Sequence, residues 1–182
     1  LLDPETGEYN SGAVSRFLPQ LPVHIIDFVG RTQGLIVPKG NPRNLEGVED
    51  LLKSGVRFIN RQKGSGTRLF TDYLISEFNL DSTAILGYQV EEYTHWAIAA
   101  AVESGDADVG VGIKAAAMSS SLDFIPLGEE KYQLVVPSIY VKDSDWFSIV
   151  MDVLKESTLS DQIKCLGGYD VSNMGKVDAV IE

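Results

Sequence analysis

Apolar residues along the chain fall into short runs that are separated by turn residues. Two runs, 23–28 and 34–38, have the length and β-branched character of strands, and Pro38 ends the second. The same criteria predict strands over 56–59, 84–90, 107–113, 124–127 and 133–136. Helical spacing of apolar positions recurs over 45–52, 67–78, 94–104, 145–155 and 159–166. Strands that alternate with helices predict an α/β fold with a mostly parallel sheet and helices on both faces.

Length, composition and charge narrow the class of protein. The chain has 182 residues, of which 44% are hydrophobic, enough for one domain or two small lobes with a sizeable core. No apolar run is long enough to cross a bilayer, so we predict no membrane contact. Fifteen basic and 26 acidic residues give a net charge of −11, which repels nucleic acids. An anion site on such a chain must work through donors focused locally.

Several kinds of chemistry are not supported by the sequence. Cys165 stands alone, and His24 and His95 are far apart, so neither a disulfide nor a zinc site is predicted. Phosphate-loop, dinucleotide and nucleophile-elbow motifs are absent. Asp106 and Asp108 flank a strand end, where a packing role is favoured over acid–base chemistry. We therefore predict no catalytic residue and no metal ligand.

Residues 60–68, Asn-Arg-Gln-Lys-Gly-Ser-Gly-Thr-Arg, lie between a predicted strand and a predicted helix. In open α/β sheets, ligands bind at this carboxyl edge of the strands. Glycines let the backbone approach a ligand, and the first N–H groups of a helix attract anions. The candidate ligand-binding residues of this segment are Arg61, Gln62, Ser65, Gly66, Thr67 and Arg68. A tight turn followed by an ordinary helix cap explains the same pattern, and both interpretations stay open.

A second candidate segment contains Tyr88, Thr94 and His95. Thr94 is placed to cap the helix predicted to run to residue 104, with His95 in its first turn. If this helix starts at the same sheet edge as the first, the two N-termini converge on one site. For His95, a surface or internally bonded histidine is favoured, because a helix N-terminus disfavours a charged imidazole.

Taken together, segments 34–42, 58–68, 87–88, 94–95, 105–108, 122–127 and 166–170 resemble a known family. It is the periplasmic-binding-protein-like domain found at the C-terminus of MoeA-type molybdopterin biosynthesis proteins and on helix-turn-helix regulators. The domain is similar to the molybdate- and tungstate-binding proteins of ABC transporters. The resemblance implies a two-lobed type II fold with a ligand cleft. It also implies that 1–41 and 124–182 form one lobe and that 42–123 form the lobe carrying the Gly-Ser-Gly-Thr-Arg turn.

The resemblance implies a sensor or delivery domain for a small oxyanion, molybdate or tungstate first, linked to molybdenum cofactor biosynthesis or its regulation. Such a domain is not an enzyme by itself and holds no covalent cofactor. It would be fused to a MoeA-like or helix-turn-helix domain in the cytoplasm, or lie in the periplasm if it serves a transporter. The alternatives are an accessory part of a molybdenum-inserting transferase that binds an anionic pterin, and an interaction module with a degenerate site.

The chain departs from the family pattern at its start. The family domain opens with a strand–helix–strand unit, and Leu1 resembles the segment just after that unit. The first lobe is therefore expected to be incomplete, with an open sheet edge that favours a homodimer.

Overall fold

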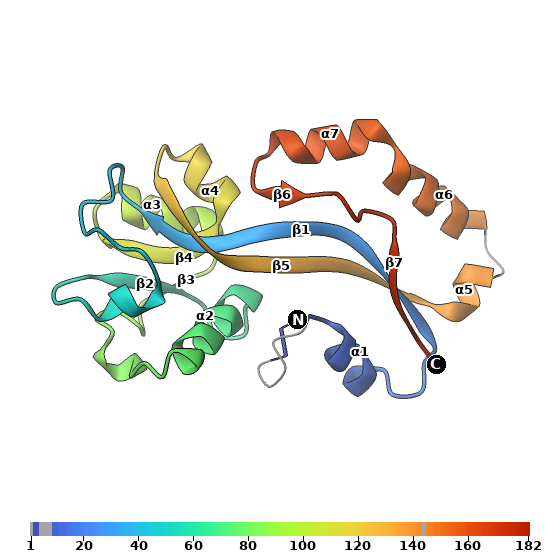
Figure 1. The fold of residues 1–182 in the computed structure, drawn as a ribbon, viewed down its shortest axis with the longest axis horizontal. Coiled ribbons are helices and arrows are strands. Elements are labelled where there is room, and N and C mark those ends of the chain that lie inside the picture. The colour runs from blue at the N-terminus through green and yellow to red at the C-terminus, as the bar shows by residue number, and fades with distance from the viewer. Residues whose placement is uncertain (1, 4–8, 143–144) are drawn as a thin grey trace. The chain divides into compact units, whose positions relative to one another are not determined.

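A computed structural model describes residues 2–3, 9–142 and 145–182. The chain forms two compact units, one from Leu1–Arg31 with Glu130–Glu182 and the other from Thr32–Glu129. Strands β1 (Val23–Val37) and β5 (Asp123–Pro137) run from one unit into the other (Figure 1). The units are thus joined through strands. Their boundaries fall inside β1 and β5, whereas the lobe boundaries expected from the sequence lie near the ends of these strands.

The unit formed by Thr32–Glu129 is built on strands β2 (Phe58–Arg61), β3 (Glu91–Glu92) and β4 (Val109–Ile113). With β1 and β5 they form a sheet in the order β3-β2-β4-β1-β5. Strand β2 is parallel to β3 and β4, and β1 is antiparallel to β4. The α/β fold is confirmed, but the sheet is mixed and not mostly parallel as expected, because the long strand β1 pairs antiparallel with its neighbour β4.

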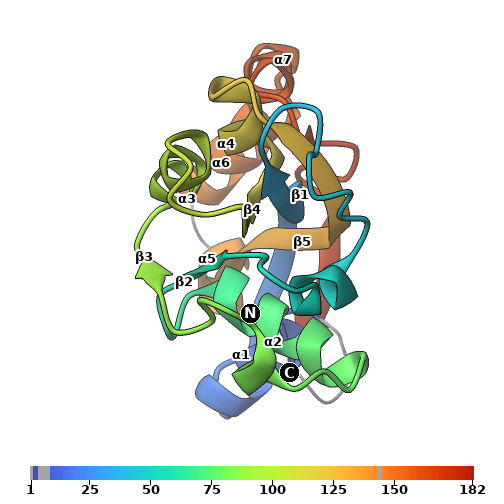
Figure 2. The same ribbon diagram turned by 90° about the vertical axis from the view of Figure 1, so that its left-hand side faces the viewer.

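Helices cover both faces of this sheet. Helix α2 (Gly66–Glu77) lies on one face. Two short 3-10 helices flank it in the sequence, η1 (Val48–Leu52) before it and η2 (Ser82–Ala84) after it. Helices α3 (His95–Glu103) and α4 (Lys114–Ser119) lie on the opposite face (Figures 1 and 2). Each face has its own cluster of buried apolar side chains, so the sheet is the middle layer of this unit.

Glycines in β4 set how closely α3 approaches the sheet. All five residues of β4 are buried. A Cβ atom on Gly110 would lie 2.5 Å from Cγ2 of Ile98, and one on Gly112 would lie 3.6 Å from Nδ1 of His95. At Gly110, helix α3 therefore packs where only glycine leaves room, and its first residue, His95, lies in ordinary contact with the strand at Gly112.

The other unit contains the first half of β1 and the C-terminal elements. They are α1 (Ser11–Phe17), α5 (Ser138–Lys142), α6 (Asp145–Lys155), α7 (Ser157–Cys165), β6 (Tyr169–Asp170) and β7 (Val177–Ile181). Strands β6 and β7 both pair antiparallel with β1. Two small apolar clusters, one around Val23 and one around Ile26, form the core of this unit.

Two expected strand breaks are absent. The predicted strands 23–28 and 34–38 are one strand, β1, and 124–127 and 133–136 are one strand, β5. Polar residues between the apolar runs suggested turns. The structure instead pairs some of them: Nε of Arg31 on β1 lies 2.6 Å from Oε2 of Glu130 on β5, and both side chains are largely buried. The residues between the apolar runs therefore stay within the strands and find partners across them.

Two further predictions were wrong in detail. The helix expected over 45–52 is only the 3-10 turn η1, and Asn44 has a φ of 48°, so Gly47 rather than Asn44 precedes the first turn. The strand expected over 84–90 is a loop that follows η2, and only Glu91–Glu92 pairs as a strand. Both segments are short, so apolar spacing could not separate helix, strand and loop.

Candidate functional site

The turn between β2 and α2 is built as the sequence predicts. Gly64 has a φ of 86°, a conformation that suits glycine. Ser65 is the N-cap of α2, and its Oγ accepts a hydrogen bond of 3.1 Å from the backbone N–H of Arg68. The N–H groups of Gly66 and Thr67 stand at the positive end of the helix, where no intrahelical carbonyl reaches them. The turn into a helix is confirmed, and it presents donors that suit an anion.

Arg61, the last residue of β2, is held against the start of α3. Its guanidinium donates to the carbonyl oxygen of Tyr93 at 2.9 Å and to that of Glu92 at 3.3 Å. Its Nη1 lies 2.9 Å from Nδ1 and 3.1 Å from Nε2 of His95. Arg61 and His95 are both buried, so the guanidinium is fixed in place with little freedom to lose on binding.

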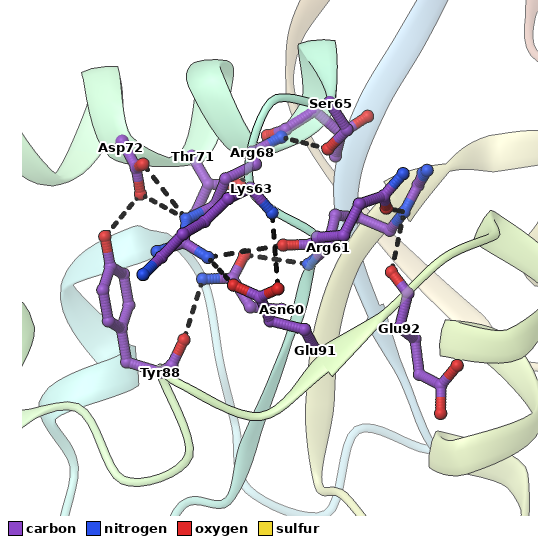
Figure 3. Close-up of polar contacts among 12 residues, drawn as sticks. Asn60, Arg61, Lys63, Ser65, Arg68, Thr71, Asp72, Tyr88, Glu91 and Glu92 are labelled. Carbon is purple, nitrogen blue, oxygen red and sulfur yellow. Dashed lines mark hydrogen bonds and ion pairs between the residues drawn. The ribbon is translucent and has the colours of Figure 1, made fainter.

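Arg68 belongs to a different network. Its Nε donates to both carboxylate oxygens of Asp72, at 2.9 and 3.0 Å, and its Nη1 donates to Glu91 at 2.9 Å. The guanidinium also lies over the ring of Tyr88, 4.5 Å from its centre. Figure 3 shows Arg68 between these carboxylates while Arg61 extends towards Glu92. Two carboxylates balance the charge of Arg68. Its first role is therefore structural, and a direct contact with a ligand is a weaker expectation.

Tyr88 completes this network as a donor. Its hydroxyl donates to Oδ1 of Asp72 at 2.6 Å. Burial, together with the hydrogen bond to Asp72, raises the pKa of the Tyr88 phenol. Burial opposes the charge of Arg68, but its hydrogen bonds to Tyr88 and Asp72 raise the pKa of the guanidinium. The Tyr88 phenol is therefore neutral and the Arg68 guanidinium is charged at neutral pH.

The second predicted helix start lies at the same sheet edge. Thr94 is the N-cap of α3, and its Oγ1 accepts from the N–H of Ala97 at 3.0 Å. Strands β2 and β3 are parallel, with Arg61 opposite Glu92, so α2 and α3 both begin just beyond this register position. The structure therefore brings Arg61 to His95 and Arg68 to Tyr88. Gln62 follows β2, and its Oε1 accepts from Nε of Arg61 at 3.2 Å.

Three residues in this network were not singled out from the sequence. Asn60 is fully buried, donates to the carbonyl of Tyr88 at 3.2 Å and accepts from the N–H of Arg61 at 2.9 Å. Asp72 and Glu91 hold Arg68. Only Asn60 carried a signal, because an amide at the end of an apolar strand needs partners. The two acids looked like ordinary surface residues.

Other candidate chemistry has a structural explanation. Asp108 accepts hydrogen bonds from the backbone and the guanidinium of Arg57, and these bonds hold the pKa of Asp108 below its usual range. Within residues 2–3, 9–142 and 145–182, no three metal-ligating side chains gather into a metal site. No helix in the same part of the chain has the length and apolar character needed to cross a bilayer.

Residues 1–155 of the chain match the family model of the PBP superfamily domain. The chain belongs to the PBP superfamily. A relative from Bacillus subtilis, the uncharacterized protein YvgK, is 38% identical over 177 residues. These residues are 97% of this chain but 56% of YvgK, so the chain spans little more than half of that relative. A Clostridium pasteurianum protein, known from the 5′ region of a 2Fe-2S ferredoxin gene, is 32% identical over 60% of the chain and 96% of its own length.

Solved structures place this PBP superfamily domain with substrate-binding proteins in fold. A substrate-binding domain assigned to a molybdenum ABC transporter of Clostridium difficile aligns with a TM-score of 0.62 and 19% identity, over 87% of this chain and 71% of that one. An ancestral arginine-binding protein bound to arginine gives 0.56 and 16%, over 87% and 68%. PEB3 bound to L-phospholactate gives 0.53 and 15%, over 80% and 68%. At these low sequence identities, the structural likeness establishes the fold alone.

Proposed function

We propose that this chain is a ligand-binding domain for a small oxyanion, which binds at the start of α2. The observation that carries the proposal is the capped N-terminus of α2 at the carboxyl edge of β2, with the N–H groups of Gly66 and Thr67 directed away from the helix. The buried guanidinium of Arg61 lies at the end of the same strand. Backbone donors and a fixed guanidinium suit an anion with several oxygens.

The candidate contacts do not carry equal weight. Gly66 and Thr67 offer backbone donors, and Arg61 and Gln62 lie at the end of the strand that leads into this turn. The oxygens of Ser65 and Thr94 already accept cap hydrogen bonds, although each hydroxyl keeps its proton to donate. Arg68, Tyr88 and His95 are proposed to shape the site, because they bind Asp72, Glu91 and Arg61.

Molybdate and tungstate are the first ligands to test, because the resemblance to molybdopterin biosynthesis domains and the likeness to a molybdenum transporter domain both favour them. The domain would then act in molybdenum cofactor biosynthesis or its regulation, fused to a MoeA-like or helix-turn-helix domain, and would work in the cytoplasm. An anionic pterin is the alternative if the domain serves cofactor assembly. Other proteins of this fold bind arginine or L-phospholactate, which supports a small charged ligand but not its identity.

Calorimetric titration with molybdate, tungstate, sulfate and phosphate tests this proposal. We expect saturable, stoichiometric binding of at least one ion. Arg61→Ala should weaken it about ten-fold or more, because a hydrogen bond to a charged group contributes about 1.5–3 kcal/mol. His95→Ala should weaken it less, because the imidazole contacts Arg61 and acts through it.

Arg57→Ala is the matched control. It removes the same charge, but Arg57 pairs with Asp108, away from the start of α2, and its side chain is 46% exposed. Its affinity should stay close to that of the unmodified protein. Equal losses in Arg57→Ala and Arg61→Ala would mean that only net charge matters, and would reject the assigned site.

A further inference from the structure

Gln33, in the middle of β1, carries an amide that the described residues leave without a partner. Its side chain is fully buried, and both Nε2 and Oε1 are out of reach of solvent and lack a hydrogen bond. The other fully buried amide of this unit, Asn60, has partners for both its nitrogen and its oxygen. An enclosed polar group without a partner opposes folding, and proteins rarely keep one without a purpose. Leucine or methionine would fill the same space more favourably.

The pairing of β1 with β4 places Gln33 at the edge of the sheet where α2 begins. Gln33 lies opposite Ile113, the last residue of β4, and the register runs without a shift from Gln33 to Ile36. Strand β4 is parallel to β2. Gln33 is therefore level with the carboxyl ends of these strands, which is the edge that carries the start of α2.

The face of β1 on which Gln33 lies is the face that α2 covers. Side chains alternate along a strand, so Gln33 shares a face with Leu35 and Val37. Both of these pack in the cluster that contains Ile75 of α2. Helix α2 also reaches β5, the other neighbour of β1, because a Cβ on Gly128 would lie 3.0 Å from the ring of Phe70. Helix α2 thus packs on the face of the sheet on which Gln33 lies.

We propose that Gln33 is a ligand contact of the oxyanion site at the start of α2. This inference rests on the proposed function and adds a rule of selectivity. An amide offers an N–H donor and a carbonyl acceptor. Nε2 would donate to a ligand oxygen, while Oε1 would accept a proton that the ligand carries. Of two anions with similar size and charge, the site therefore favours the one with a hydroxyl, hydrogen phosphate over sulfate. Molybdate and tungstate, which carry no proton at neutral pH, would use the Nε2 donor alone.

Because the amide is enclosed, binding includes a conformational step. Either the Gln33 side chain turns about its own bonds or the first turn of α2 shifts before the ligand reaches the amide. The observed binding rate is then expected to level off at high ligand concentration and to stay below the diffusion limit.

The test compares Gln33→Leu with the unmodified protein, by calorimetric titration with hydrogen phosphate, sulfate and molybdate at about pH 8. Thr71→Val is the matched control, because Thr71 is equally buried on α2 and its hydroxyl bonds only within the helix, to the carbonyl of Thr67. The unmodified protein should prefer hydrogen phosphate to sulfate. Gln33→Leu should lose that preference and bind its best ligand about ten-fold more weakly, while it melts at the same or a higher temperature. Thr71→Val should keep the preference.

The other outcomes separate two claims, that an oxyanion binds at the start of α2 and that Gln33 contacts it. If the protein binds an ion and Gln33→Leu binds it equally well, Gln33 is only a buried side chain and the oxyanion site stands without it. Sulfate binding as tightly as hydrogen phosphate overturns the selectivity rule. Failure of the unmodified protein to bind any of these ions rejects the site and the role of Gln33 together. If Gln33→Leu does not fold, Gln33→Met, which keeps the length of the side chain, is measured in its place.

Discussion

The two units differ in how fully their own residues cover their apolar surface. In Thr32–Glu129, both faces of the sheet carry clusters of completely buried side chains. In the other unit, α6 has an apolar face of which only Leu154 is buried, while Trp146, Ile149 and Val153 are 43–61% exposed. The unit that carries the candidate site therefore has its own core, and it can hold Arg61 and the start of α2 in a fixed geometry.

The difference should appear most strongly when one large apolar side chain is removed from each unit. Phe58 is 2% exposed and packs in the cluster under α2, so Phe58→Ala should lower the free energy of unfolding by about 3–5 kcal/mol. Trp146→Ala, on the exposed face of α6, should cost about 1 kcal/mol, mainly its ring contacts with Tyr140 and Phe147. Urea unfolding followed by circular dichroism measures both. Equal losses would contradict the comparison.

A smaller effect is expected on self-association, which the exposed face of α6 favours. The net charge of −11 opposes contact between copies, and salt screens that repulsion beyond about 10 Å at 0.1 M ionic strength. Association should thus rise with salt, and Ile149→Asp should reduce it, since Ile149 is 61% exposed. Sedimentation at two ionic strengths measures this. If the unmodified protein is a monomer at both ionic strengths, or if Ile149→Asp associates as strongly as the unmodified protein, this face of α6 does not mediate association.

The sequence predicted the parts of the fold that have a long, regular pattern. Helices α2, α3 and α6 follow apolar spacing closely, and the Thr94 cap was recognised. A cap before α2 was considered, but it was not assigned to Ser65. The continuity of β1 and β5 was not predicted, because polar residues between the apolar runs, such as Arg31 and Glu130, find partners only in the neighbouring strand. Pairing of that kind depends on which strands become neighbours, and local sequence does not record it.

The candidate site was predicted in place but not in detail. The segment from Asn60 to Arg68 does join a strand to a helix at one sheet edge. The sequence did not show that Arg68 faces two carboxylates while Arg61 faces the start of α3, because the partners of each side chain depend on which elements become its neighbours. Nor did it place Gln33, which it assigned to a break between two strands. Side-chain direction needs the register, and the register is set by tertiary pairing.

The claim that an oxyanion binds at the start of α2 is tested most directly by nuclear magnetic resonance of the backbone amides. Molybdate, tungstate, sulfate and phosphate are titrated in turn. We expect the amide signals of Gly66 and Thr67 to shift most and to saturate with one ion, while the signal of Gly105, beyond the far end of α3, stays unchanged. Saturable shifts confined to other residues, or no shift at Gly66 and Thr67 with any of the four ions, would contradict it.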